Sequence, residues 1–244
     1  MVKLARQKPR YGYRRLHAML ERRGANSGQP LNVKRVYRLY LEEGLSVRRK
    51  KRKRLVRERA AEPRLTGPNQ EWAMDFVADG LANGRMVRIL TVVDAYTREC
   101  LALEADFSFG SGRVTRVLEH VIAERGRPEN VRSDNGPEFT SRHMIGWAEQ
   151  WKAGLINIEP GKPMQNGHVE SFNGRLRDEC LNTSWFRTLN DVRETLANWR
   201  REYNCERPHS SLDYRRPEKF RQSTGCENKI LKQNLTRETP AMNG

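Results

Sequence analysis

Three acidic residues in this chain of 244 residues have neighbours and a spacing that suit phosphate chemistry. Asp75 lies in an apolar, strand-like run (WAMDFV), Asp134 lies in the run SDNGPEF, and Glu170 follows after 35 intervening residues in the run QNGHVESFN. Carboxylate oxygens are the ligands that hard divalent cations prefer, and such cations leave room for phosphate. Two of these cations can activate the attacking oxygen and stabilise the leaving oxygen of an in-line phosphoryl displacement. The three acids therefore predict an enzyme that cuts and joins nucleic acid.

Each acid also has an ordinary structural interpretation when it is taken alone. Asp75 could be a solubilising charge on a strand edge. Asp134 begins an Asp-Asn-Gly sequence that is typical of a turn, and Glu170 could be a solvated helix residue. Their occurrence together, in one order of predicted strands and helices, favours the catalytic interpretation.

Strand and helix patterns alternate from residue 70 onward, and Asn83-Gly84 is a strong hairpin signal between the first two strands. The order of the elements predicts an α/β (α+β) fold in which a mixed five-stranded sheet is flanked by helices. The predicted strands span residues 71–78, 86–93, 99–107, 130–133 and 155–159, and the predicted helices span residues 112–125, 141–152 and a segment that begins near Pro163 and carries Glu170.

This order of elements would bring the acids to one edge of the sheet. Functional groups of open α/β sheets lie at strand ends and in the adjoining loops. Asp75 lies within the first predicted strand and Asp134 lies just past the fourth. On the third helix, Glu170 is expected to point away from the core, because an adjoining apolar stripe would anchor the helix. That stripe consists of Val169, Phe172, Leu176 and Cys180.

Positive charge is concentrated in the N-terminal quarter of the chain. The chain has 46 Lys and Arg residues against 30 Asp and Glu residues, a formal net charge of +16. Residues 1–60 hold 20 of the basic residues and 4 of the acidic residues, which accounts for the whole surplus. Such a segment is an electrostatic footprint for a polyanion, and the helix pattern within it, described next, favours double-stranded DNA.

Two short amphipathic helices are predicted within this basic segment. The first spans residues 12–23 and stops at Gly24, and the second is capped by Asn32 and closed by Gly44. Two helices joined by a turn predict a helix-turn-helix, whose second helix normally enters the major groove. A plain helical hairpin with a solvated basic face is the alternative. The candidate DNA contacts are Arg14, Arg15, Lys34, Arg35 and Arg38.

A dense basic run follows the second helix. So many like charges repel one another and do not suit a packed core, so the run is predicted to be an arm that tracks phosphates. Binding through this arm should depend steeply on salt, because neutralised phosphates release counterions. The candidate contacts in it are Arg48, Arg49, Lys50, Lys51 and Arg52.

The cysteines and the hydropathy pattern bear on the compartment. The four cysteines are scattered and, with five histidines, show no zinc-site spacing. Scattered thiols suit a reducing cytosol. The sequence has no apolar run of about 18 residues and no secretion signal. We expect a cytoplasmic protein, associated with the nucleoid, that has no membrane partner.

Seven short sequences, together with the spacing of the acids, carry a family resemblance. They are YGYRR (11–15), WxxD (72–75), SDNGPEF (133–139), PGKP (160–163), QN (165–166), VESFN (169–173) and YNxxRPHSSL (203–212). With these the chain resembles the DDE transposases of bacterial insertion sequences, within the retroviral-integrase superfamily. It looks like the second-frame (OrfB-type) product of the group that makes its transposase from two frameshifted reading frames. The fused enzyme's upstream DNA-binding module and leucine zipper are expected to lie outside these 244 residues.

The resemblance implies an RNase H-like catalytic core in which Asp75, Asp134 and Glu170 bind Mg²⁺, expected as two ions that Mn²⁺ can replace. The implied activity is hydrolysis at the ends of the element to free a 3′-OH, followed by attack of that hydroxyl on a target phosphodiester. No covalent protein intermediate is implied. The implied partners are the element ends, the target DNA, further copies of this chain in a homo-oligomer on the DNA, and the upstream-frame product.

Four residues near the acids are further candidate DNA contacts, because they share the face of Glu170 or lie in the preceding loop. They are Lys162, Asn166, Asn173 and Arg177. His168 points about 160° away from Glu170 around the helix. It is expected to be structural or solvent-facing rather than catalytic.

Two alternatives to a transposase stay open. A structure-specific nuclease of RNase H type would cleave but not join, and the basic N-terminal helices argue against it. A DNA-binding remnant or regulator would occupy element ends without catalysis, and the presence of all three acids argues against it.

The expected domain organisation has five parts. They are a helix-turn-helix-like DNA-binding segment (1–47), a basic linker (48–68), an RNase H-like integrase catalytic core (69–183), a C-terminal helical extension of the core (184–221) and a disordered tail (222–244).

Overall fold

A computed structural model describes residues 1–25, 29–47, 65–159 and 166–224. The chain divides into two compact units. One unit is Met1–Arg64 with Arg207–Arg215, and the other is Leu65–Glu206 with Arg216–Gly244. The predicted tail falls outside the described residues from 225 onward, while residues 217–224 are helical. No described helix combines the length and the apolar character that a membrane span requires.

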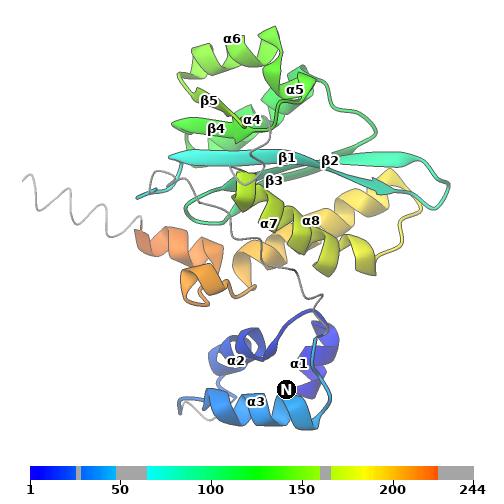
Figure 1. Ribbon diagram of the computed structural model, residues 1–244, viewed down its shortest axis with the longest axis vertical. Coiled ribbons are helices and arrows are strands. Elements are labelled where there is room, and N and C mark those ends of the chain that lie inside the picture. The colour runs from blue at the N-terminus through cyan, green and yellow to red at the C-terminus, as the bar shows by residue number, and fades with distance from the viewer. Residues whose placement is uncertain (26–28, 48–64, 160–165, 225–244) are drawn as a thin grey trace, which may run out of the picture. The chain divides into compact units, whose positions relative to one another are not determined.

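The larger unit is built on one five-stranded sheet with the strand order β3-β2-β1-β4-β5 (Figure 1). β1, β2 and β3 are antiparallel neighbours, whereas β4 pairs in parallel with both β1 and β5. The predicted mixed five-stranded sheet is therefore confirmed. The strands are β1 (Glu71–Gly80), β2 (Met86–Asp94), β3 (Cys100–Asp106), β4 (Asn130–Ser133) and β5 (Gly154–Asn157).

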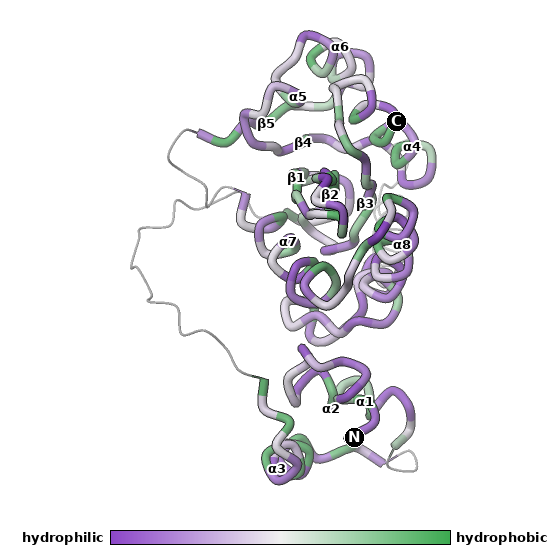
Figure 2. Tube along the Cα trace, turned by 90° about the vertical axis from the view of Figure 1, so that its right-hand side faces the viewer, coloured by the Kyte–Doolittle hydropathy of each residue, from purple (hydrophilic) through white to green (hydrophobic). Residues whose placement is uncertain are grey.

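Helices cover both faces of this sheet, as Figures 1 and 2 show from two directions. α4 and α6 pack on one face with Trp72 and Met74 of β1, and α7 and α8 pack on the other face with Ala73 and Val77. Because side chains alternate along a strand, Asp75 lies on the α7 and α8 side of the sheet. The helices are α4 (Ser111–Arg125), α5 (Pro137–Thr140), α6 (Arg142–Trp151), α7 (Gly167–Glu179) and α8 (Leu189–Cys205).

The smaller unit contains α1 (Val2–Gln7), α2 (Tyr13–Arg22) and α3 (Val33–Glu42). The two predicted helices are confirmed as α2 and α3. Asn32 caps α3 by accepting a hydrogen bond from the Lys34 backbone N–H at 2.9 Å. Gly24 and Gly44, just beyond the helix ends, have φ of 63°, a left-handed conformation that costs glycine little.

Two short helices were not expected, and strand and helix ends differ from the expected positions by a few residues. α1 was not expected, because its six residues are too few to show a helical period. The four-residue helix α5 was missed for the same reason, and it directly follows the Asp-Asn-Gly sequence. α7 begins at Gly167 rather than near Pro163, which lies outside the described residues.

Side chains of α8 satisfy the free backbone edge of β3. Asn204 makes two hydrogen bonds with Cys100, accepting from its N–H and donating to its carbonyl, each at 2.9 Å. Arg193 donates to the Ala105 carbonyl at 3.0 Å, and Arg200 donates to the Cys100 carbonyl at 3.0 Å. An unpaired strand edge invites pairing with another chain. α8 therefore closes this edge while it covers the sheet.

We expect Asn204→Ala to destabilise the larger unit by about 1–3 kcal/mol, because the buried N–H and C=O of Cys100 lose their shared partner. Urea denaturation followed by circular dichroism measures the change. The matched control is Asn190→Ala, which removes an exposed amide on the same helix. Equal stability of the two variants would show that water replaces Asn204 at the strand edge.

The described cysteines differ in burial. Burial raises the pKa of the Cys100 thiol and of the Cys180 thiol to about 12, and both are buried, whereas Cys205 is only half-buried. The thiolate is the reactive form. In a Cys226→Ser background at pH 8, iodoacetamide should therefore modify Cys205 and leave the two buried thiols unmodified until the protein unfolds. Rapid labelling of Cys100 in the folded protein, seen by mass spectrometry, would contradict this.

Candidate active site

Asp75 lies in the middle of β1 and is half-buried beneath α7. Its Oδ1 accepts a hydrogen bond from the Phe76 backbone N–H at 2.7 Å. Its Oδ2 accepts one from Nδ2 of Asn173, in α7, at 2.8 Å. One strand and one helix, 98 positions apart in the chain, therefore meet at this carboxylate.

Asp134 is exposed directly after β4. The parallel register pairs Ala73 with Arg132, so two further residues along each strand would bring Asp134 level with Asp75. The turn after Asp134 leaves little space beside Gly136. The Gly136 N–H donates to Oδ1 of Asp134 at 3.1 Å, and a Cβ at position 136 would lie 3.1 Å from that same oxygen.

Glu170 lies in the first turn of α7 and is exposed. The predicted apolar stripe anchors this helix, since Val169, Phe172 and Leu176 are all buried in the core shared with α8. The Phe172 ring meets the rings of Trp199 and Tyr203 edge-on, with centroid distances of 5.5 Å and 5.0 Å. Glu170 thus projects from a helix that is tightly held on its opposite side.

The pKa of Asp75 responds to the charges of the other two acids. Burial raises the pKa of Asp75, and the negative charges of Asp134 and Glu170 raise it further, while the hydrogen bonds from Phe76 and Asn173 oppose the rise. Both charges disfavour the ionised form of Asp75 in the absence of a cation. The structure therefore places Asp134 and Glu170 near enough to Asp75 for their charges to act on it.

The donor set fits a hard divalent cation, because all three side chains offer carboxylate oxygens and a bound positive charge would offset the repulsion of Asp75 by Asp134 and Glu170. Within the described ranges, no group of three or more His, Cys, Asp or Glu side chains is already close enough to hold an ion. The charges of Asp134 and Glu170 act on Asp75, but the three carboxylates do not converge on one point where they could coordinate an ion.

Glu138, a fourth acid in the SDNGPEF run, has a structural partner. Its Oε1 accepts a hydrogen bond from Arg88 of β2, whose guanidinium also lies 4.0 Å from the centre of the Phe76 ring. Burial favours the neutral form, but the hydrogen bond to Arg88 prevails and lowers the pKa of Glu138. The sequence offered no signal for this pairing across 50 positions.

The candidate DNA contacts on α7 differ in exposure. Asn166 and Asn173 are only 3% and 8% exposed, whereas Arg177 is exposed and donates to the Ala78 carbonyl at 3.2 Å. Half-buried His168 accepts a hydrogen bond from Arg98. Burial, and secondarily the Arg98 charge, lower the pKa of His168 to about 4. The contacts expected at Lys162 and at Arg48, Arg49, Lys50, Lys51 and Arg52 lie outside the described residues.

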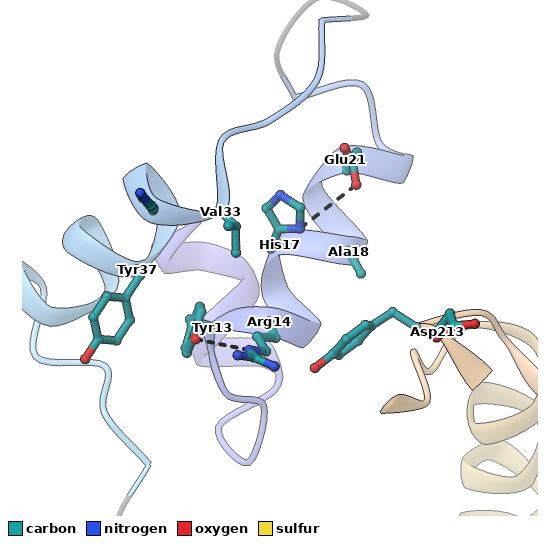
Figure 3. A pocket seen from close by; sticks show the side chains of 10 residues that line it. Tyr13, Arg14, His17, Ala18, Glu21, Val33, Tyr37 and Asp213 are labelled. Carbon is teal, nitrogen blue, oxygen red and sulfur yellow. Dashed lines mark hydrogen bonds and ion pairs between the residues drawn. The ribbon is translucent and has the colours of Figure 1, made fainter. Parts of the chain in front are cut away.

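The smaller unit presents basic and aromatic groups. Lys34, Arg35 and Arg38 are exposed on α3, and Arg14 is exposed on α2, whereas the Arg15 guanidinium lies 5.4 Å from the centre of the Tyr11 ring. Figure 3 shows a pocket of about 440 Å³ in this unit. Its lining includes Tyr13, Arg14, His17, Lys34, Tyr37 and Tyr214.

Three family models match the chain. An integrase core domain matches residues 66–163, a second integrase core domain matches residues 152–217, and an HTH-like domain matches residues 3–53. Together they cover both units.

The curated relatives are proteins of insertion elements. The chain is 48% identical over 223 residues to the insertion element IS407 uncharacterized 31.7 kDa protein of Burkholderia multivorans, a match that covers 90% of this chain and 78% of that protein. It is 48% identical over 221 residues to the insertion element IS476 uncharacterized 39.2 kDa protein of Xanthomonas euvesicatoria, covering 90% and 63%. It is 28% identical over 230 residues to transposase InsD for insertion element IS2D of Escherichia coli, covering 89% and 75%.

Solved integrase structures share the fold. The catalytic core domain of HTLV-2 integrase in complex with magnesium (dimeric form) superposes with a TM-score of 0.51 at 17% identity, covering 64% of this chain and 97% of that one. The simian T-cell lymphotropic virus intasome in complex with PP2A regulatory subunit B56 gamma gives a TM-score of 0.59 at 17% identity, covering 96% and 77%. The expected RNase H-like core of integrase type is thereby confirmed.

Proposed function

Because the chain belongs to the insertion-element transposases that carry an integrase core domain, and so to the DDE class of transposases and integrases, we propose that it cleaves DNA at the ends of its element and transfers the freed 3′-OH into target DNA. The observation that supports the proposal is that Asp134, in the loop after β4, and Glu170, on α7, both act electrostatically on the Asp75 carboxylate of β1.

In this proposal the three carboxylates hold Mg²⁺, expected as two ions, and Mn²⁺ substitutes for it. When bound, the ions would activate the attacking oxygen and stabilise the leaving oxygen of the displacement. Asp75 supplies a ligand from a rigid strand, while Asp134 and Glu170 supply exposed ligands from its flanks. Cleavage and joining can use one site, because water and a DNA 3′-OH are alternative nucleophiles for the same phosphodiester chemistry.

The smaller unit is proposed to bind the element ends. The exposed cations on its helix α3 suit contact with DNA phosphates. In the larger unit, exposed Arg177 on α7 is proposed to contact the DNA strand that enters the site of the three acids. Element ends and target DNA are the substrates of this proposal. Further copies of this chain, and the upstream-frame product, are its proposed protein partners on DNA.

Lys34→Ala and Arg35→Ala should each weaken DNA binding and lower the slope of log affinity against log salt by about 0.9, because each removes one phosphate contact. Fluorescence anisotropy with a duplex of the element end, in a series of salt concentrations, measures the slope. Lys219→Ala, which removes an exposed lysine of the larger unit, is the control and should leave it unchanged. Unchanged slopes in all three variants would favour the solvated helical hairpin.

The proposed activity is tested with the full chain and a duplex that carries the element's own ends. We expect nicking that frees a 3′-OH, followed by joining to a second duplex, only when Mg²⁺ or Mn²⁺ is present. Nicking without joining would favour the RNase H-type nuclease. Binding without either reaction would favour the DNA-binding remnant.

A further inference from the structure

Asn173 connects α7 to the Asp75 carboxylate. Its Nδ2 donates to Oδ2 at 2.8 Å, while the Phe76 N–H donates to Oδ1 at 2.7 Å. Each oxygen of Asp75 therefore receives one N–H from the protein. An ionised carboxylate has about four acceptor positions, so both oxygens keep room for a further ligand.

The orientation of the Asn173 amide follows from charge. An ionised carboxylate only accepts hydrogen bonds, so the amide must present its nitrogen to Asp75 and turn its oxygen away. That oxygen is buried and, among the described residues, has no hydrogen-bond partner. An unsatisfied buried acceptor is unfavourable, and an apolar side chain of similar shape would avoid it. The needs of folding alone therefore do not explain an asparagine at this position.

The Asn173 amide can counteract the repulsion that the other two acids exert on Asp75. Asp134 and Glu170 both repel the Asp75 carboxylate, and without a counter-charge the carboxylate would be favoured to turn away from them. The hydrogen bond from Asn173 opposes that movement. Asn173 lies one helical turn after Glu170 on the same helix, so the bond also fixes Glu170's helix against the strand of Asp75.

We infer that Asn173 is a positioning residue that holds the Asp75 carboxylate against α7, the helix that carries Glu170, before a divalent cation draws the acids together. The inference rests on the proposed function and assigns Asn173 a role other than DNA contact. The Asn173 side chain is only 8% exposed, and its amide nitrogen already donates a hydrogen bond to Asp75. Partners that orient metal ligands typically contribute about 10–100-fold to metal affinity or activity.

The test compares wild type with Asn173→Leu, a variant of similar shape that lacks the amide. Three quantities are measured on the full chain. They are the melting temperature in chelator, the affinity for Mn²⁺ by isothermal titration calorimetry, and the affinity for an element-end duplex in chelator. The matched control is Asn190→Leu, which removes another amide-to-carboxylate hydrogen bond, to Glu194 at 3.0 Å on α8.

We expect Asn173→Leu to melt within about 4 °C of wild type or higher, to bind Mn²⁺ at least about tenfold more weakly, and to bind DNA as wild type does. The control should match wild type in all three. Loss of DNA affinity with Mn²⁺ affinity intact would make Asn173 a DNA contact and overturn the inference. A large fall in melting temperature would make its role structural, and wild-type values throughout would remove any role; both overturn it. If wild type itself binds no Mn²⁺, the proposed function fails and the inference fails with it.

Discussion

Glu170→Gln and Asp75→Asn are each expected to lower cleavage and joining of an element-end duplex at least about a thousandfold. Each change removes one negative charge from the proposed metal site and leaves the shape of the side chain nearly unchanged. Metal ions at such sites provide several kcal/mol of transition-state stabilisation, and about 4 kcal/mol corresponds to a thousandfold in rate. Gel-resolved strand cleavage and strand transfer in Mg²⁺ measure the loss.

The controls for this prediction come from the same strand and the same helix. Asp79→Asn changes a carboxylate in β1, and Glu179→Gln changes the last residue of α7. Both should keep activity within about threefold, because neither carboxylate is one of the three proposed metal ligands and each change keeps the size of the side chain. All four variants should retain wild-type DNA affinity in chelator. Full activity in Glu170→Gln would remove it from the catalytic centre.

Phe172→Ala is expected to have the largest effect on stability, about 3–5 kcal/mol, because it opens a cavity where α7 meets α8. Phe172 is 1% exposed, and its ring contacts the rings of Trp199 and Tyr203. For a chain of this size the loss corresponds to a fall in melting temperature of about 6–20 °C. Circular dichroism at 222 nm during heating in chelator measures it.

Because α7 also carries Glu170, the Phe172→Ala variant should lose DNA cleavage at temperatures where its circular dichroism is still native-like. Trp185→Ala is the control, since Trp185 is 82% exposed and its removal opens no cavity. Equal melting temperatures for the two variants would mean that the contact between α7 and α8 contributes little to the larger unit.

The five strands and the helices that flank them were predictable because each has a clear local pattern. β2 is a short run rich in β-branched apolar residues, whereas α4 repeats apolar residues at the helical spacing of 3.6 residues, so the two patterns can be told apart. The three acids could be singled out for a different reason: their neighbours and their spacing are a family signature. Which face of β1 carries Asp75 then follows from alternation with Ala73 and Val77.

The contacts of the site could not be predicted, because they join distant parts of the chain. A helical wheel places Asn173 on the face of Glu170 but does not say how that face is turned toward the sheet. The expectation that this face points away from the core is right for exposed Glu170 and wrong for Asn173, which is buried against Asp75. Within one turn of α7, the Glu170 side chain faces solvent and the Asn173 amide is buried against β1. The pairing of Arg88 with Glu138 is likewise a tertiary contact without a local signal.

The most direct test of a metal centre at Asp75, Asp134 and Glu170 is cleavage of the protein by its own bound ion. Fe²⁺ takes the place of Mg²⁺ in the full chain, ascorbate and peroxide generate hydroxyl radicals at the ion, and mass spectrometry locates the backbone cuts. The account predicts cuts clustered beside residues 75, 134 and 170, in the presence of an element-end duplex, that excess Mg²⁺ suppresses. Cuts elsewhere, or cuts that Mg²⁺ does not suppress, would contradict a divalent-metal site built from these three acids.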